Sequence, residues 1–486
     1  MDEETLNQFS KDREYVLSYL RHDARTFAST LYTERRTGPF WNRQTETFSP
    51  YLSLNNVALC CLIGSPTTKV KPNICLVSTV EPLAHQGKEG ETLLVKAGSI
   101  RQPQYFVLKI FNLDRPEIRY FESPISNINR LGSSPQLELC LYPNISDLQY
   151  IGADNFTNEY LVGFILNELY RKSSSTTKGA PAQVAQAGQR TDGAFDGISA
   201  TSAGLNGTIR FIAATICNSG TKRKGTIIMD YADLGDIQSF VKNPLTSEYR
   251  EVQNFSDQGG NRFQFSALKT KVIVDICKQV VANLDFLHRE VEFNHGDFKA
   301  NNVLIKSTTS QGNYQGLTWN SNITVKIADF GKSSLTITDN HSRRTRFFNY
   351  SSSAETYLGV FPFKPSIGAQ FDQPYYLLDT NTNLAALARI RHMGLPYYFS
   401  MDLYTFVISI LLIPEIFFPV MTDTKLRTVL FDSLWFQDDY STAWNRIYNA
   451  VQQGKDNSYN VILDILAGLK LKCAATTILL EGLKTL

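Results

Sequence analysis

The chain has 486 residues, which is long enough for two or three compact units and a sizeable buried core. Hydrophobic residues make up 43% of the chain and charged residues 19%, which is typical of a globular protein. The formal net charge of +2 gives no electrostatic reason to expect a nucleic acid or a membrane surface as a partner.

The N-terminal part is predicted to be an extension followed by strands. Residues 1–75 form the extension, with a helix over about 3–34 and no residues of recognisable chemistry. Over 75–111, three runs rich in β-branched and aromatic residues (ICLVSTV, ETLLVKA and QYFVLKIF) predict short strands separated by turns.

One helix and one insertion are predicted next. The helix covers 157–170, where Leu161, Ile165 and Leu169 recur every four residues. The segment 172–207 is small, polar and aperiodic, so it cannot bury enough apolar surface to order itself. We expect it to be a flexible insertion.

The second half of the chain is predicted to be mostly helical. A strand that leads into a helix is expected at 225–241, and a long helix with one apolar stripe at 267–290. Two short strands, VLIK and TVKIA, flank a polar insertion at 307–322. A long irregular stretch, 332–396, precedes an apolar helix at 402–418, and the last 65 or so residues are expected to be helical. Strands followed by helices predict a small sheet beside a larger helical part.

The apolar run YTFVISILLIPEIFFPVM approaches the length of a membrane span. It contains Pro414, Glu415 and Pro419, so a buried core helix is the better prediction and no membrane span is expected. The charged, amphipathic N-terminus does not resemble a signal peptide. The seven scattered cysteines, an odd number, argue against a secreted disulfide framework. These features predict an intracellular, cytoplasmic protein.

A few charged residues stand at the spacings that phosphoryl transfer requires, because this reaction depends mainly on positioning and charge neutralisation. Asp297 and Asn302 lie in the loop NHGDFKANN (294–302), between the long helix and a short strand. Their spacing lets the carboxylate meet an acceptor hydroxyl while the amide holds a metal. Asp329 opens the motif DFG after a strand-like run, where its carboxylate can bind Mg²⁺. Lys109 lies in the strand-like run FVLKIF, from which it can reach phosphates.

These motifs, in this order, resemble the protein kinase family over roughly residues 75–470. The resemblance implies an α+β, bilobal fold with a small β-rich lobe over 76–230 and a larger α-helical lobe over 231–486. It also implies ATP and Mg²⁺ or Mn²⁺ as cofactors and proteins as substrates. Lys299, two positions after Asp297, resembles the Ser/Thr kinases of the family.

Carried over residue by residue, the resemblance assigns a role to each candidate. Asp297 and Lys299 would be catalytic, with Asp297 as the base and Lys299 on the γ-phosphate. Asn302 and Asp329 would hold the metal. The nucleotide site would be formed by residues from the glycine loop, the strand lysine, its acidic partner, the hinge and the floor of the pocket: Gly87, Gly90, Lys109, Glu159, Met229, Asp230, Ala232, Asp236 and Leu304.

Two parts of the small lobe depart from the family's pattern. Only one of Glu159 and Glu168 can point at Lys109, because nine residues separate the two glutamates and place them on opposite faces of one helix. Glu159 is preferred, and the long gap between it and the lysine requires an insertion at about 113–150. In HQGKEGET, Gly87 and Gly90 keep the second and third glycines of the phosphate loop, but His85 replaces the first.

Two residues of the large lobe have expected structural roles. Asp402, in SMDLYTFVISILL, resembles the carboxylate that braces the catalytic loop in the family. Gly296 stands where many kinases carry an arginine that pairs with a phosphate on the activation segment. We therefore expect that activity does not require phosphorylation of that segment through this route.

Three functions remain open. The first is a Ser/Thr protein kinase. The second is a small-molecule phosphotransferase of the aminoglycoside or choline kinase type, whose loops also read HGD but typically lack Lys299 and the DFG motif. The third is a pseudokinase scaffold, which the altered glycine loop favours and the presence of the strand lysine, the base and both metal ligands disfavours. The divergent loop and the insertions are also similar to kinases of large double-stranded DNA viruses, which implies a place in the virion.

Overall fold

The computed structural model describes just over half of the chain. The predicted N-terminal helix, most of the segment 172–207, Gly87 and His85 lie outside the described residues. The described residues are 41–42, 47–48, 77–83, 90–99, 102–113, 118–121, 148–153, 155–176, 205–219, 222–256, 262–338, 344–349, 399–435, 472 and 475–486.

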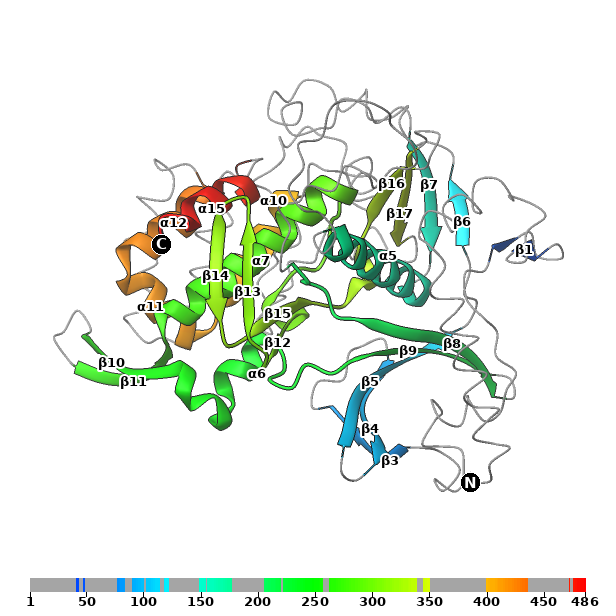
Figure 1. Cartoon of the computed structure of the whole chain (residues 1–486), viewed down its shortest axis with the longest axis horizontal. Coiled ribbons are helices and arrows are strands. Elements are labelled where there is room, and N and C mark those ends of the chain that lie inside the picture. The colour runs from blue at the N-terminus through cyan, green and yellow to red at the C-terminus, as the bar shows by residue number, and fades with distance from the viewer. Residues whose placement is uncertain are drawn as a thin grey trace, which may run out of the picture.

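Lys109, a candidate site residue, lies in a five-stranded antiparallel sheet (Figure 1). Its strand order is β3-β4-β5-β9-β8, and the predicted strands before residue 112 are confirmed. The strands are β3 (Val77–Pro82), β4 (Gly90–Ser99), β5 (Gln102–Leu113), β8 (Phe211–Ser219) and β9 (Lys222–Asp230).

Helix α5 (Asn155–Thr176) lies against β8 of this sheet on one side and against β17 on the other (Figure 1). The predicted helix is confirmed and is longer than expected, because it continues through residues 172–176. Its apolar stripe of Leu161, Ile165 and Leu169 is buried, as the four-residue spacing predicts.

A second, six-stranded sheet was not expected from the sequence. Its order is β1-β2-β6-β7-β17-β16, and β17 runs parallel to β7. Two of its strands lie within 332–396, so the prediction of an irregular stretch is wrong there. The pairing joins segments almost 200 residues apart, which local periodicity cannot reveal. The strands are β1 (Trp41–Asn42), β2 (Thr47–Phe48), β6 (Ile118–Phe121), β7 (Leu148–Ala153), β16 (Leu335–Thr338) and β17 (Arg344–Asn349).

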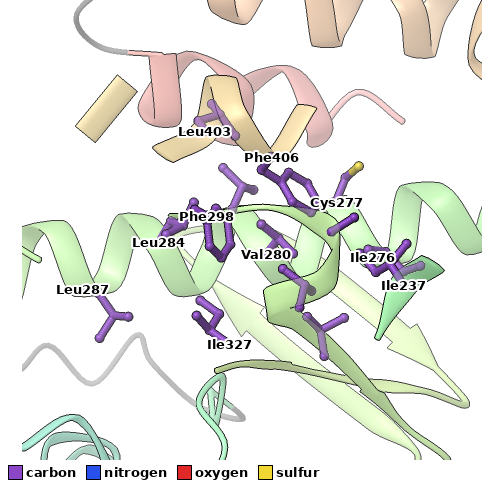
Figure 2. Close-up of a cluster of buried hydrophobic side chains, with 14 of the residues drawn as sticks. Ile237, Ile276, Cys277, Val280, Leu284, Leu287, Phe298, Ile327, Leu403 and Phe406 are labelled. Carbon is purple, nitrogen blue, oxygen red and sulfur yellow. The ribbon is translucent and has the colours of Figure 1, made fainter. Parts of the chain in front are cut away.

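Helix α7 (Thr270–Val291) is the long predicted helix and forms the centre of the main core. Its buried residues Ile276, Val280 and Leu284 face Phe298 of the catalytic loop and helix α10 (Phe399–Leu411), as Figure 2 shows. The helix begins later than expected, because residues 267 and 268 complete a strand.

The apolar segment predicted as one helix at 402–418 forms two. Helix α10 ends at Leu411, and α11 (Pro414–Thr422) follows after a bend of 97°. Pro414 occupies the first turn of α11, where its missing N–H is tolerated, so a new helix starts there instead of the old one continuing. Among the described residues, no single helix is long and apolar enough to cross a membrane; α10 and α11 reach that length and composition only as a bent pair.

The remaining elements complete a mixed α+β fold, as predicted. The polar insertion between the short strands β12 and β15 forms a hairpin, β13–β14, and buries Trp319 beside α7. These elements are α6 (Ile237–Lys242), η4 (Pro244–Tyr249), β10 (Arg250–Ser256), β11 (Arg262–Leu268), η5 (Ala300–Asn302), β12 (Val303–Lys306), β13 (Ser310–Tyr314), β14 (Leu317–Ser321), β15 (Thr324–Ile327), η6 (Phe330–Lys332), α12 (Thr424–Leu434) and α15 (Ala475–Leu483).

Candidate active site

Lys109 joins two carboxylates that come from distant parts of the chain. It lies on β5 in register with Thr92 of β4, and its Nζ is 2.7 Å from Glu159 Oε2 and 2.7 Å from Asp329 Oδ1. The Glu159 side chain is completely buried, whereas that of Asp329 is 43% exposed. The sheet, helix α5 and the DFG motif therefore meet at one ammonium group. The side chain of Glu168, the alternative partner, lies outside the described residues.

The charged groups of this cluster stabilise one another in their ionised forms. Burial disfavours the ammonium form of Lys109, but the carboxylates of Asp329 and Glu159 outweigh it and raise the lysine pKa above its usual value. Partial removal from water favours the neutral acid of Asp329, yet the nearby Lys109 lowers its pKa to about 2. Asp329 is thus an anion at any physiological pH and can serve as a metal ligand.

Asp329 also has an unusual backbone conformation. Its φ of 66° and ψ of 67° fall in the left-handed region, which residues other than glycine rarely adopt. Such conformations cost about 1–3 kcal/mol and persist at functional sites where the surroundings impose them. This one places the carboxylate beside Lys109 while Phe330 turns into the core, where it is fully buried.

Asp297 is held between two lysines. Its carboxylate lies 3.1 and 3.2 Å from Lys299 Nζ and 3.2 Å from Lys332 Nζ, and only 7% of its side chain is exposed. Asn302 donates from Nδ2 to the Asp297 carbonyl oxygen at 2.7 Å, which fixes the loop between them. The predicted loop thus brings a carboxylate, two ammonium groups and an amide into one place.

Asp402 fixes the backbone of the loop 294–302 through hydrogen bonds. Its two carboxylate oxygens accept backbone N–H bonds from His295 at 2.5 Å and Gly296 at 3.0 Å. Burial raises the pKa of Asp402 to about 7, while the two N–H donors act in the opposite direction and favour the anion. Further along α10, Thr405 donates to the carbonyl oxygen of Phe298 at 2.7 Å. The apolar helix therefore fixes the loop through a few polar groups.

His295 packs under the loop as a neutral ring. It is completely buried, and burial lowers its pKa below the usual value. Its Nε2 is 2.9 Å from the carbonyl oxygen of Ala328, and its Nδ1 lies 3.4 Å from the backbone nitrogen of Asp297. These partners assign the proton to Nε2, which donates to Ala328, and make Nδ1 the acceptor.

Gly296 is required by the shape of the loop. Its φ is +76°, and a Cβ at this position would lie 2.5 Å from the carbonyl oxygen of Lys332. An L-residue would meet both a strained backbone and a backbone clash. The absence of an arginine here is thus built into the geometry of the loop.

The expected hinge residues lie at the end of β9 and just after it, with different partners. Met229 is buried, and Asp230 forms an ion pair with Arg210 at 2.9 Å. The carbonyl oxygen of Ala232 accepts a bond from the backbone of Gly235 at 3.1 Å. Asp236, expected near a ribose, caps α6 by accepting from Ser239 N at 2.8 Å and Ser239 Oγ at 3.1 Å, and it forms a bridge with Leu304 of β12.

The glycine loop is described only at its end. Gly90 begins β4 and is in register with Phe111 of β5, while Gly87 lies outside the described residues. Three residues that contact the site were not predicted from the sequence: Lys332, Asn158 and Asn349. A lysine directly after DFG was visible in the sequence, but its contact with Asp297 depends on the local turn. The two asparagines approach the motif only through the tertiary fold.

Residues 208–349 match the family model for protein tyrosine and serine/threonine kinases. This segment includes Asp297, Asn302 and Asp329, whereas Lys109 and Glu159 precede it. No curated protein matches the chain. Residues 208–349 therefore match a protein kinase domain, and the resemblance noted in the sequence is confirmed for this part of the chain.

Proposed function

We propose that the protein is a Ser/Thr protein kinase that transfers the γ-phosphate of ATP to hydroxyl groups of other proteins. The observation that carries the proposal is the joint geometry of two clusters: Lys109 between Glu159 and Asp329, and Asp297 between Lys299 and Lys332. Phosphoryl transfer is catalysed mainly by positioning and electrostatic stabilisation, and these clusters supply the charged groups for it. Specificity for Ser and Thr is supported by Lys299 alone.

Asp297 is the residue that acts on the acceptor. Its carboxylate would orient the substrate hydroxyl and take up its proton as the phosphoryl group leaves ATP. The ammonium groups of Lys299 and Lys332 would offset the negative charge of the transferring group. Asp402 acts through the loop backbone and keeps Asp297 in place.

The residues present fit a nucleotide with a divalent metal. Mg²⁺ usually takes one or two carboxylates and completes its shell with water and phosphate oxygens. Among the described residues, no group of three or more His, Cys, Asp or Glu could hold a metal alone, which suits an ion shared with ATP. Asp329 and the side-chain oxygen of Asn302 would be its protein ligands. When bound, Mg²⁺ or Mn²⁺ would neutralise charge on the phosphates, while Lys109 would bind the α- and β-phosphates.

The finer organisation is also part of the proposal. The five-stranded sheet with α5 would be the small lobe, over 76–230, and the α7 side would be the large lobe, over 231–486. Met229, Asp230 and Ala232 would form the hinge against adenine. The similarity to kinases of large double-stranded DNA viruses, and with it a place in the virion, stays a prediction based on sequence pattern.

The proposal is tested by incubating the purified chain with γ-labelled ATP, Mg²⁺ or Mn²⁺ and generic acidic and basic proteins. We expect label on Ser and Thr of the protein acceptor and none with the Asp329→Asn variant. Label only on small alcohols or amines would favour a small-molecule phosphotransferase. No transfer, together with no thermal shift on adding nucleotide, would favour a scaffold, and label on Tyr would refute the Ser/Thr specificity.

A further inference from the structure

Asn158 of α5 holds the backbone that follows Asp329. Its side chain is completely buried, and its Nδ2 lies 3.2 Å from the carbonyl oxygen of Phe330, 3.1 Å from that of Gly331 and 2.7 Å from that of Ser333. An amide has two hydrogens, so the three oxygens share them. Asn158 immediately precedes Glu159 in the chain, so one turn of helix contacts both Lys109 and the DFG backbone.

Asn349 reaches the same backbone from the second sheet. Parallel pairing sets Asn349 of β17 opposite Ala153, the last residue of β7, and α5 begins two residues later at Asn155 (Figure 1). The Nδ2 of Asn349 donates to the carbonyl oxygen of Gly331 at 2.6 Å and lies 3.3 Å from Asn155 Oδ1. A Cβ on Gly331 would lie 2.2 Å from that Asn155 oxygen, so a larger residue would require the Asn155 side chain to move.

The β16–β17 hairpin is fastened to the catalytic loop as well. Arg346 is completely buried, and its guanidinium donates to the carbonyl oxygen of Glu292 at 2.5 Å, to Thr336 at 3.0 Å and to Ser334 at 2.9 Å. Two backbone bonds of 2.8 Å join Asn294 and Ser334. The hydroxyl groups of Ser334 and Thr336 are buried, so they are not accessible acceptors for phosphorylation while the hairpin is folded.

We propose that Asn158 and Asn349 are positioning residues for Asp329. Their side-chain amides hold residues 330–333 so that the carboxylate stays beside Lys109, and they do this without a phosphate on the activation segment. Gly296 offers no side chain for such a phosphate, and the asparagine pair fixes the same segment by internal hydrogen bonds. This inference rests on the proposed kinase function, because Asp329 is taken as a metal ligand.

The test compares Asn158→Leu and Asn349→Leu with a control on the same helix, Asn167→Leu. Asn167 also makes several hydrogen bonds, donating to Ile209 O at 2.9 Å and accepting from Phe211 N at 2.6 Å, but these partners belong to β8 and its approach and not to the backbone of residues 330–333. All proteins are first treated with a phosphatase. The readouts are the Mg²⁺ concentration for half-maximal transfer and amide hydrogen exchange over 330–338.

We expect the Asn158 and Asn349 variants, and not the Asn167 control, to differ from the wild type. The dephosphorylated wild type should be active, and Asn158→Leu and Asn349→Leu should each need about tenfold more Mg²⁺ and exchange faster over 330–338. Asn167→Leu should match the wild type in both. If Asn158→Leu does not fold, Asn349→Leu decides. Variants that behave like the control, or a wild type inactivated by the phosphatase, would overturn the proposal.

The kinase function and the positioning role of the asparagine pair are tested by different readouts. A wild type that transfers no phosphate under any condition would refute the kinase function. Hydrogen exchange would then still decide whether the asparagine pair fixes the DFG backbone, because that readout needs no activity. Unchanged exchange in both variants would refute the positioning role even in an active kinase.

Discussion

At the scale of single residues, the site depends on groups that tolerate little change. Lys109 neutralises a fully buried glutamate, Asp329 holds a left-handed backbone, and Gly296 occupies a space that no side chain fits. The first was predictable from the order of motifs in the sequence. The last two depend on dihedral angles that an amino-acid sequence does not state. The motif HGD is visible in the sequence, but the need for glycine at its second position is explained only by the backbone geometry of the loop.

We predict that Gly296→Ala lowers the free energy of unfolding by about 2–4 kcal/mol, because strain at positive φ adds to a clash with the Lys332 carbonyl. Gly235→Ala is the matched control. Its φ of +74° is nearly the same, but a Cβ there would approach only a side-chain carbon of Ser239, at 3.0 Å. Urea denaturation of both variants measures the difference. Equal losses would show that the clash at Gly296 contributes nothing.

At the scale of elements, local pattern predicted the strands around Lys109 and the helices α5 and α7. Local pattern did not predict the features that depend on long-range strand pairing or on a single proline. Pro414 divides the apolar segment into two helices, and β17 pairs in parallel with the distant β7 as well as with β16. The apolar stripe of α7 was visible because one face packs on Phe298 and α10 (Figure 2). The positions of Asn158 and Asn349 relative to DFG could not be predicted, since they depend on that pairing.

Helix α7 should make stability dependent on pH. His288, in its last turn, is buried, and burial lowers its pKa to about 3. The unfolded chain takes up a proton near pH 6.5 and the folded chain does not, so stability is fully present above pH 6.5 and is lost as pH falls toward 3. At pH 4.5 the loss should reach about 3 kcal/mol from this residue.

The variant His288→Gln should therefore flatten the pH dependence of the melting temperature between pH 6.5 and 4.5. His295, whose pKa is also lowered, and Asp402, whose raised pKa acts in the opposite direction, are unchanged in the variant, so only the contribution of His288 to the slope is removed. The comparison is made by differential scanning calorimetry at several pH values. An unchanged slope would mean that His288 is protonated in the folded protein or is not buried in solution.

At the scale of the whole molecule, the site is assembled from both sheets and both halves of the chain. β5 supplies Lys109, α5 supplies Glu159 and Asn158, and the loop before β12 supplies Asp297. The β16–β17 hairpin links the second sheet to the catalytic loop. The sequence predicted the charged residues of the candidate site because their spacings match those that phosphoryl transfer requires. It could not predict the links between them, which are long-range hydrogen bonds.

Asp297 is proposed to act on the acceptor hydroxyl during phosphoryl transfer. The most direct test is the single-turnover rate of transfer from ATP to a protein acceptor, at saturating ATP and Mg²⁺, for the wild type and Asp297→Asn. The asparagine keeps the shape of the side chain but cannot take up the proton, so we expect the rate to fall by about 10²–10⁴-fold while nucleotide affinity stays unchanged. An Asp297→Asn variant that transfers phosphate as fast as the wild type would contradict the account.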